Sequence, residues 1–402
     1  MSNGYSSQFL GSFPVGSVIQ SPANINDPSW LRLDGSIITR ASYPALSALM
    51  PGVGTFTPTS RTLAATPAAS AMSVNGANIV VPGASGASAV QYSSNAGVSW
   101  TLATTPASFS VNTNGLIYTG TNFFALGGPA NTGIYSPSGT GSGAWTASTG
   151  ITSGPTTCAT NGAGTILAPA GGSMNISTNN GATFSSYSFV GAGGAGSPIV
   201  YTGTQWLLFC GASGAAGQGL QTSTTGLVGS WNPLISPPWD NTQIYAACSD
   251  GAGNVLAVSA ASSVAWASNN NGTTWRQTLL PSTSAGSCSY ANGRWFVASE
   301  VQAVNSFYSD GSCSVSSDLQ SWVTVPLMGT PDMTNNQAAG IYVGYSGGNY
   351  IAIGGGVSLG STLLTSTENA TQLYLPASRR QGMVTNFSIN SIANWQEWIK
   401  AA

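Results

Sequence analysis

Two groups of side chains in this sequence have the chemistry to hold a carbohydrate. Each combines aromatic faces with hydrogen-bonding polar groups, and a sugar ring has apolar faces and a hydroxylated rim. The groups lie in two of the longest connections, and their members are Trp239, Asp240 and Asn241, and Phe307, Tyr308 and Asp310. The alternative interpretation of Trp239 is that it only packs its long connection.

Chemistry that breaks bonds has little support in the sequence. The chain contains no histidine, which excludes Ser-His-Asp and Cys-His nucleophile systems and histidine metal sites. Asp240, Asp310 and Asp332 are scattered, so no carboxylate pair suited to glycoside hydrolysis is visible in the sequence. We therefore expect a protein that is not an enzyme and that has no cofactor and no metal site.

The low charge content limits the possible partners. Of 402 residues, 8 are Lys or Arg and 10 are Asp or Glu, so 4% are charged where about 25% is usual. No basic cluster is present, and the sequence therefore predicts no binding of nucleic acid. No apolar run reaches the roughly 20 residues that cross a bilayer, and the first residues lack the pattern of a secretory signal, so we expect no membrane insertion.

The five cysteines are predicted to be reduced core residues. Cys158, Cys210, Cys248, Cys288 and Cys313 have no CxxC spacing and are odd in number, and free cysteine packs as a small hydrophobic residue. Three of them, Cys158, Cys248 and Cys288, precede repeated turns at positions that look equivalent. This pattern favours core packing over disulfides.

An internal repeat organises residues 70 to 375. Seven copies of a turn followed by an apolar strand recur, clearest at 118–128, 201–211, 290–300 and 345–355. Each copy closes on an aromatic residue: Trp100, Trp145, Phe184, Trp231, Trp275, Trp322 and Tyr374. Their spacing of 39 to 52 residues fits four short strands with turns, and nothing in the region has a helical period. Seven such units predict an all-β, seven-bladed β-propeller.

A tighter turn motif precedes three of these aromatic residues. It reads Ser, any residue, Asn, any residue, Gly, any residue, Ser or Thr, and then an aromatic residue. Asn and Gly tolerate the left-handed backbone region that a compact turn requires. The copies consist of Ser93, Asn95, Gly97 and Trp100; Ser177, Asn179, Gly181 and Phe184; and Ser268, Asn270, Gly272 and Trp275, while a shorter fourth copy keeps Asp318 and Trp322.

This motif resembles the Asp-box of sialidase-like propellers, with Asn in place of the usual Asp. The resemblance implies that these residues form a structural turn on the face opposite the ligand site. Sialidases clamp their substrate with three arginines, whereas the predicted propeller contains only Arg276 and Arg294. Sialidase activity is therefore not expected.

The two ends of the chain carry a different pattern. Residues 13–56 contain Pro-Val-Gly-Ser-Val-Ile from Pro14, Trp-Leu-Arg-Leu-Asp-Gly from Trp30 and Tyr-Pro-Ala-Leu from Tyr43. They resemble the tail-collar module of bacteriophage tail fibres, and residues 373–402 resemble its later part more loosely. We therefore expect a propeller at 66–375 inserted into a small α+β collar-like module formed by 1–65 and 376–402. The sequence leaves two candidates for the strand that closes the ring: residues 59–67 and the segment at Tyr374.

These resemblances imply a structural protein of the bacteriophage virion, assembled in the host cytoplasm as part of a tail fibre or similar appendage. Its expected partners are other virion proteins and a glycan or protein of the host cell surface. Two alternatives stay open: a purely structural fibre or decoration protein, and a glycan-degrading virion enzyme. The oligomeric state is also open, with a homotrimer, common among fibre proteins, as one alternative.

Overall fold

The structure is a computed structural model of the whole chain. It describes residues 15, 17–21, 25, 27–32, 37–49, 52–53, 56–66, 71–84, 88–106, 109, 115–127, 131–188, 197–210, 219–232, 239, 244–259, 263–281, 285–299, 312–326, 341–354, 362–367, 372–374 and 396–401.

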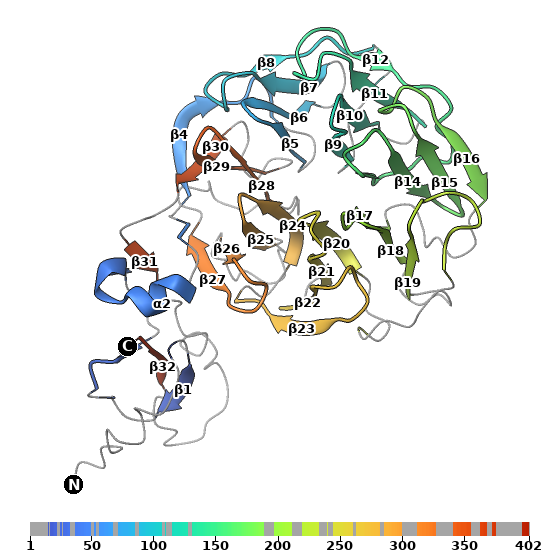
Figure 1. Cartoon of the computed structure of the whole chain (residues 1–402). Helices are drawn as coiled ribbons and strands as arrows, with labels where there is room; N and C mark the ends of the chain where they lie inside the picture. Colours follow the sequence, from blue (N-terminus) through green and yellow to red (C-terminus); the bar gives the residue numbers. More distant parts are fainter. Residues whose placement is uncertain are drawn as a thin grey trace, which may run out of the picture.

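Short antiparallel sheets arranged around a central axis make a seven-bladed β-propeller (Figure 1). The prediction of an all-β propeller with seven blades is confirmed. Blades 1 to 3 are β5 (Ser73–Asn75), β6 (Asn78–Ala84), β7 (Ser88–Ser93) and β8 (Thr101–Leu102); β9 (Leu116–Tyr118), β10 (Phe123–Leu126), β11 (Gly133–Ser136) and β12 (Thr146–Ala147); and β13 (Ala159–Thr160), β14 (Ile166–Ala170), β15 (Ser173–Ser177) and β16 (Ser185–Ser188).

Within each blade the first strand lies nearest the axis and the later strands follow outward (Figure 1). Blades 4 to 6 are β17 (Ile199–Tyr201), β18 (Trp206–Cys210) and β19 (Gly219–Ser223); β20 (Ile244–Ser249), β21 (Val255–Ser259), β22 (Val264–Ser268) and β23 (Arg276–Leu279); and β24 (Ala285–Ala291), β25 (Arg294–Ser299), β26 (Ser312–Ser316) and β27 (Val323–Pro326). Antiparallel order places two kinds of connection at opposite ends of the blades. The turns between first and second and between third and fourth strands form the turn face, and the remaining connections form the loop face.

The seventh blade joins the two ends of the propeller chain. Its inner strands are β28 (Ile341–Ser346), β29 (Asn349–Gly354) and β30 (Thr362–Thr367), and its outermost strand is β4 (Thr57–Thr62), in the order β28-β29-β30-β4. The segment around 59–67 therefore supplies the closing strand. Tyr374 lies instead in β31 (Gln372–Tyr374), which pairs with β3 (Ile37–Thr39) outside the ring. The predicted boundaries at 65/66 and 375/376 were wrong, because the ring includes β4 and excludes β31.

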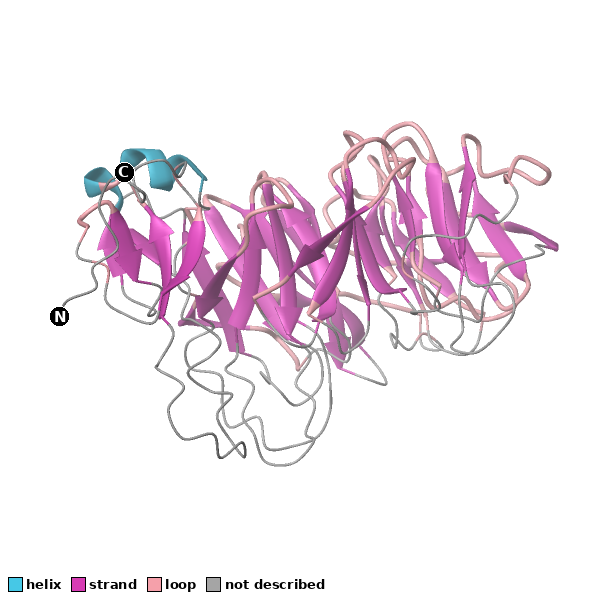
Figure 2. Cartoon of the chain, turned by 90° about the horizontal axis from the view of Figure 1, so that it is seen from below, coloured by secondary structure: helices cyan, strands magenta, loops and turns pink. Residues whose placement is uncertain are grey.

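The segments outside the ring form a terminal unit, defined as β1 (Val18–Ser21), β2 (Trp30–Arg32), β3, η1 (Arg40–Ser42), α2 (Pro44–Leu49), β31 and β32 (Gln396–Lys400). β32 lies between β1 and β2, so the two ends of the chain share one sheet. The unit sits beside blades 6 and 7, with its helix at the edge of the molecule (Figure 2). Both described helical segments are far shorter than a membrane-crossing helix.

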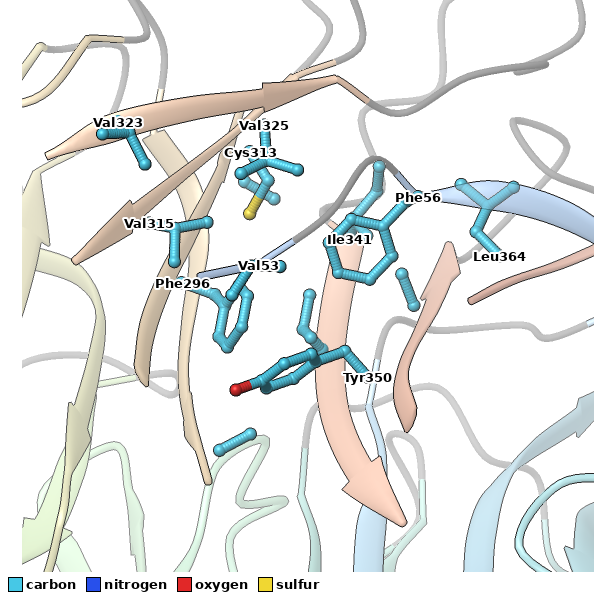
Figure 3. Packing of buried hydrophobic residues seen from close by; sticks show 14 of the residues in the cluster. Val53, Phe56, Phe296, Cys313, Val315, Val323, Val325, Ile341, Tyr350 and Leu364 are labelled. Carbon is cyan, nitrogen blue, oxygen red and sulfur yellow. The ribbon is translucent and has the colours of Figure 1, made fainter. Parts of the chain in front are cut away.

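An apolar cluster between blades 6 and 7 extends to the terminal unit. Phe56, which directly precedes β4, packs edge-on against Phe296 with ring centroids 6.4 Å apart, and Phe296 contacts Tyr350 of blade 7 (Figure 3). Leu46 of α2 and Ile399 of β32 belong to the same cluster. The terminal unit is therefore joined to the ring through a continuous apolar core.

Neighbouring blades approach each other most closely at the turn glycines. A Cβ added to Gly181 of blade 3 would lie 2.5 Å from the Phe124 ring of blade 2, and Gly226 of blade 4 stands in the same way against Leu167 of blade 3. Gly181 must be glycine for a second reason as well, because its φ of 88° lies in the left-handed backbone region. This close approach explains why a ring with large buried aromatics also needs so many small residues.

We predict that Gly181→Ala destabilises the fold by about 1–3 kcal/mol more than Gly172→Ala. Gly172 also has a φ of 88°, but nothing lies within 4 Å of the position that a Cβ would take there, so Gly172→Ala measures backbone strain alone. Gly181→Ala adds overpacking against Phe124. Urea unfolding of the two variants and the wild type measures the difference, and equal losses of stability would contradict this account of blade packing.

Candidate functional site

The turn motif on the turn face is built around a serine hydroxyl. Ser93 Oγ accepts a hydrogen bond from the Gly97 backbone N–H at 2.8 Å and donates to Asn95 Oδ1 at 2.9 Å. Asn95 Nδ2 in turn donates to Ser99 Oγ at 2.9 Å. The same bonds occur in the turns that begin at Ser177 and Ser268. The compact turns predicted from the sequence are confirmed at these three positions.

The serine of this turn occupies one register position in all seven blades. It pairs with the first or second residue of the second strand, as in Ile79 with Ser93 and Tyr350 with Ser366. All seven serines are buried: Ser93, Ser136, Ser177, Ser223, Ser268, Ser316 and Ser366. The sequence motif named Ser93, Ser177 and Ser268, and its shorter fourth copy starts at Ser316. Ser136, Ser223 and Ser366 were missed because their following turns differ in length and composition.

The turn in blade 6 uses a carboxylate where the turns that begin at Ser93, Ser177 and Ser268 use an amide. Burial by itself raises the pKa of Asp318, but hydrogen bonds outweigh it, so the pKa of this carboxyl lies below its usual value. Asp318 Oδ1 accepts from the backbone N–H groups of Gln320 and Ser321, both at 2.7 Å, and from Ser316 Oγ at 3.0 Å. Asp318 is therefore a structural anion on this face.

Side chains of the turns also connect neighbouring blades. Asn180, at the variable position after Asn179, accepts a hydrogen bond from Thr119 Oγ1 of blade 2 at 2.8 Å. Asn271 of blade 5 accepts one from Thr204 Oγ1 of blade 4 at 2.9 Å. Hydroxyl and amide groups of the turn face thus form hydrogen bonds with one another across blades. We therefore assign this face a structural role.

The ring encloses an axial cavity of about 330 Å³. Its wall comes from the first strands of the blades, and it includes four tyrosines and three cysteines: Tyr201, Tyr245, Tyr290, Tyr342, Cys158, Cys248 and Cys288. None of the described lining residues is charged. Tyr245, near the start of β20, is 50% exposed at the loop face, and Tyr290, near the end of β24, is 37% exposed at the turn face.

Two of the cavity thiols, Cys158 and Cys248, are held in the neutral form. Burial raises the pKa of Cys158, and it raises the pKa of Cys248, where Cys288 and Asp250 add to the effect. Burial likewise raises the pKa of Tyr342, and Cys248 and Cys288 raise it further. The cavity therefore has the chemistry of an uncharged, amphipathic site rather than that of an activated nucleophile.

The structure changes the interpretation of Trp239, one member of the two predicted sugar-binding groups. Trp239 is only 4% exposed and packs against Phe209, Trp266 and Trp275, with a T-shaped contact to Trp275 at 5.2 Å. It fills the space between blades 4 and 5 and is no platform for a sugar. The other predicted residues lie outside the described part of the chain: Asp240, Asn241, Phe307, Tyr308 and Asp310.

The described arginines of the ring do not form a substrate clamp. Arg276 Nη2 donates to the Asp318 carbonyl at 3.3 Å, and Arg294 Nη1 donates to the Gly293 carbonyl at 3.2 Å. Arg61, brought into the ring with β4, lies on the outermost strand of blade 7. None of the three lines the axial cavity. Among the described residues, no three His, Cys, Asp or Glu side chains converge on a site for a metal ion.

Comparisons with known proteins identify the fold alone. The sequence matches no protein-family model and no curated protein. Its structure is similar to a streptogramin B lyase, with a TM-score of 0.59 and 11% identity over 78% of this chain and 98% of that one. It is also similar to virginiamycin B lyase from Staphylococcus aureus, with a TM-score of 0.56 and 10% identity over 78% of this chain and 99% of that one. A third similar structure is YCF48 bound to a D1 peptide, with a TM-score of 0.51 and 12% identity over 78% of this chain and 97% of that one. Proteins of this fold include enzymes and peptide-binding proteins.

We predict that Asp318→Asn makes the stability of the protein less sensitive to acid. Because the folded-state pKa of Asp318 lies below the unfolded value, its stabilising contribution is complete above the unfolded value of about 4 and is lost as the pH falls through the folded value. The asparagine can make the bonds seen at Asn95, so we expect little change at pH 7. Urea unfolding at pH 7, 5, 4 and 3 compares the two proteins.

Asn179→Asp is the matched control, since it places a carboxylate in the equivalent turn of blade 3 and should add acid sensitivity. An unchanged pH dependence in Asp318→Asn would show that this carboxyl contributes nothing to acid unfolding.

Proposed function

We propose that this protein is a structural protein of a bacteriophage virion, in a tail fibre or similar appendage. In this proposal the terminal unit is the collar-like base, and the propeller presents its loop face to the host surface. The bound partner is a glycan recognised without charge pairing. Its other partners are further virion proteins, which dock on the terminal unit.

The pairing of the chain ends is the observation that carries this proposal. Residues 13–56 and 373–402 resemble the early and late parts of one collar module. In the structure β1 pairs with β32, with Val18 opposite Ile399, and β3 pairs with β31, with Ile37 opposite Tyr374. Two segments that resemble one module thus lie side by side, while the propeller chain leaves and returns between them. This arrangement supports a terminal unit that anchors the protein and a propeller that presents its loop face.

The loop face supports the choice of a neutral ligand. Tyr245 offers a half-exposed aromatic ring at the mouth of a cavity whose described wall carries no charge. The connection that contains Phe307, Tyr308 and Asp310 joins the end of β25 to the start of β26 on this same face, and the connection that contains Asp240 and Asn241 leads into the start of β20 there. Aromatic rings, hydroxyls and amides bind sugars by stacking and hydrogen bonding. The turn face, by contrast, uses its polar groups internally.

Binding of the full chain to glycan arrays and to purified surface polysaccharides of candidate host bacteria tests the proposal. We expect Tyr245→Ala to weaken binding by about tenfold or more, since a lost aromatic stacking contact costs on the order of 1 kcal/mol or more. Tyr290→Ala, on the turn face, is the matched control and should leave affinity unchanged. Because charge pairing is not used, raising NaCl from 0.05 to 0.5 M should change affinity by less than about threefold.

Other outcomes separate the alternatives. Absence of binding to every host polysaccharide and to host cells would indicate a purely structural virion protein. Release of reducing sugar from a host polysaccharide would identify a glycan-degrading enzyme. Equal loss of binding in Tyr245→Ala and Tyr290→Ala would move the site away from the loop face.

A further inference from the structure

Two thiols meet across the interface between blades 5 and 6. Cys248 lies in β20 and Cys288 in β24, and these first strands are neighbours around the axis. Both side chains belong to the apolar cluster between the two blades, and both line the axial cavity. Cys288 also raises the pKa of the Cys248 thiol. The two thiols therefore project from neighbouring strands into one interface.

The strand registers explain why these two cysteines face each other. Cys288 pairs with Val297, and the equivalent pair in blade 5 is Ala247 with Ala257. Cys248 is thus one position further along its strand than Cys288, and the prediction that the cavity cysteines are equivalent was wrong for Cys248. Because side chains alternate between the faces of a strand, this offset points Cys248 toward blade 6 and Cys288 toward blade 5.

We propose that Cys248 and Cys288 are an oxidation site that forms a disulfide between adjacent blades when the protein meets an oxidising solution. The oxidant is a small disulfide such as oxidised glutathione. One cysteine thiolate attacks the glutathione disulfide, forms a mixed disulfide and releases one glutathione thiolate. The second cysteine thiolate then attacks the protein sulfur of the mixed disulfide and releases the other glutathione. Two electrons and two protons leave the cysteine pair, and two glutathione molecules result.

The surroundings of the pair determine how fast it reacts. The titratable groups that interact electrostatically with the thiols include Asp250 after β20, which raises the pKa of Cys248, and Tyr342 on β28, and neither is a cation that would stabilise a thiolate. Burial also disfavours the thiolate of Cys248, so this residue reacts slowly at neutral pH unless oxidant persists. Each unit of pH between 7 and 9 should raise the rate of oxidation several-fold to tenfold.

Cys158 provides an internal control for this chemistry. It lines the same cavity, and burial also raises its pKa, so small reagents that reach one thiol can reach the other. It packs in the cluster between blades 2 and 3, whose described members include no second cysteine. Cys158 should therefore remain free or take one glutathione, and should form no cross-link.

The test treats the full chain with oxidised glutathione at pH 8.5 and maps peptides by mass spectrometry without reduction. We expect one linked peptide pair, containing Cys248 and Cys288. Titration in denaturant should show a loss of two of the five thiols, or of three where Cys158 also carries one glutathione. The cross-link closes a loop of about 40 residues, so the midpoint of thermal unfolding should rise by about 3–6 °C and return on reduction.

Variants make the test specific. Cys158→Ser should oxidise as the wild type does, whereas Cys248→Ser and Cys288→Ser should each yield no linked peptide. Reduced wild-type protein that keeps five free thiols after exhaustive oxidation would overturn the proposal, and so would a linkage that joins Cys288 to Cys158. None of these outcomes bears on glycan binding, so this inference and the proposed function can fail separately.

Discussion

A hydroxyl group removed from water needs a hydrogen-bond partner, and the propeller meets this requirement in the same way around the ring. In five blades the buried serine at the end of the third strand accepts a hydrogen bond from a backbone N–H of the turn that follows, with N···Oγ distances of 2.8 to 3.0 Å. That bond fixes the turn, and the turn places a glycine, or Leu319 in blade 6, against the preceding blade. Packing between blades, and with it the ring, depends on this contact.

The same contact explains how the fold tolerates so few charges. Asn, Ser and Thr side chains satisfy most of the described turn donors and acceptors with neutral groups, and carboxylates take that place at Asp250 and Asp318. Neutral groups avoid the desolvation cost that ions would incur between closely packed blades. The axial cavity follows the same chemistry, since its described wall carries hydroxyls, thiols and apolar groups.

Spacing in the sequence was sufficient to predict the number of blades, because each blade repeats its own turn and its own aromatic residue. Ring closure could not be resolved in this way. β4 contains Thr-Pro-Thr-Ser-Arg-Thr and carries no trace of the repeat, so Tyr374 looked like the seventh closing aromatic. Trp239 was misread because an aromatic residue in a long connection looks the same whether it faces solvent or fills the gap between two blades. The facing thiols depend on a one-residue offset that only strand pairing reveals.

Ring closure by β4 also sets an order of events during synthesis. Thr59 Oγ1 donates to the Leu363 carbonyl, a residue 304 positions later in the chain. At ordinary translation rates of about 5–20 residues per second, β4 waits on the order of 15–60 s for its partner strand to leave the ribosome. Six blades can form in that time, but the facing sides of the first and sixth stay uncovered. A chain that terminates before β30 therefore remains an open arc with uncovered blade faces, and only a chain that includes β30 can close the ring.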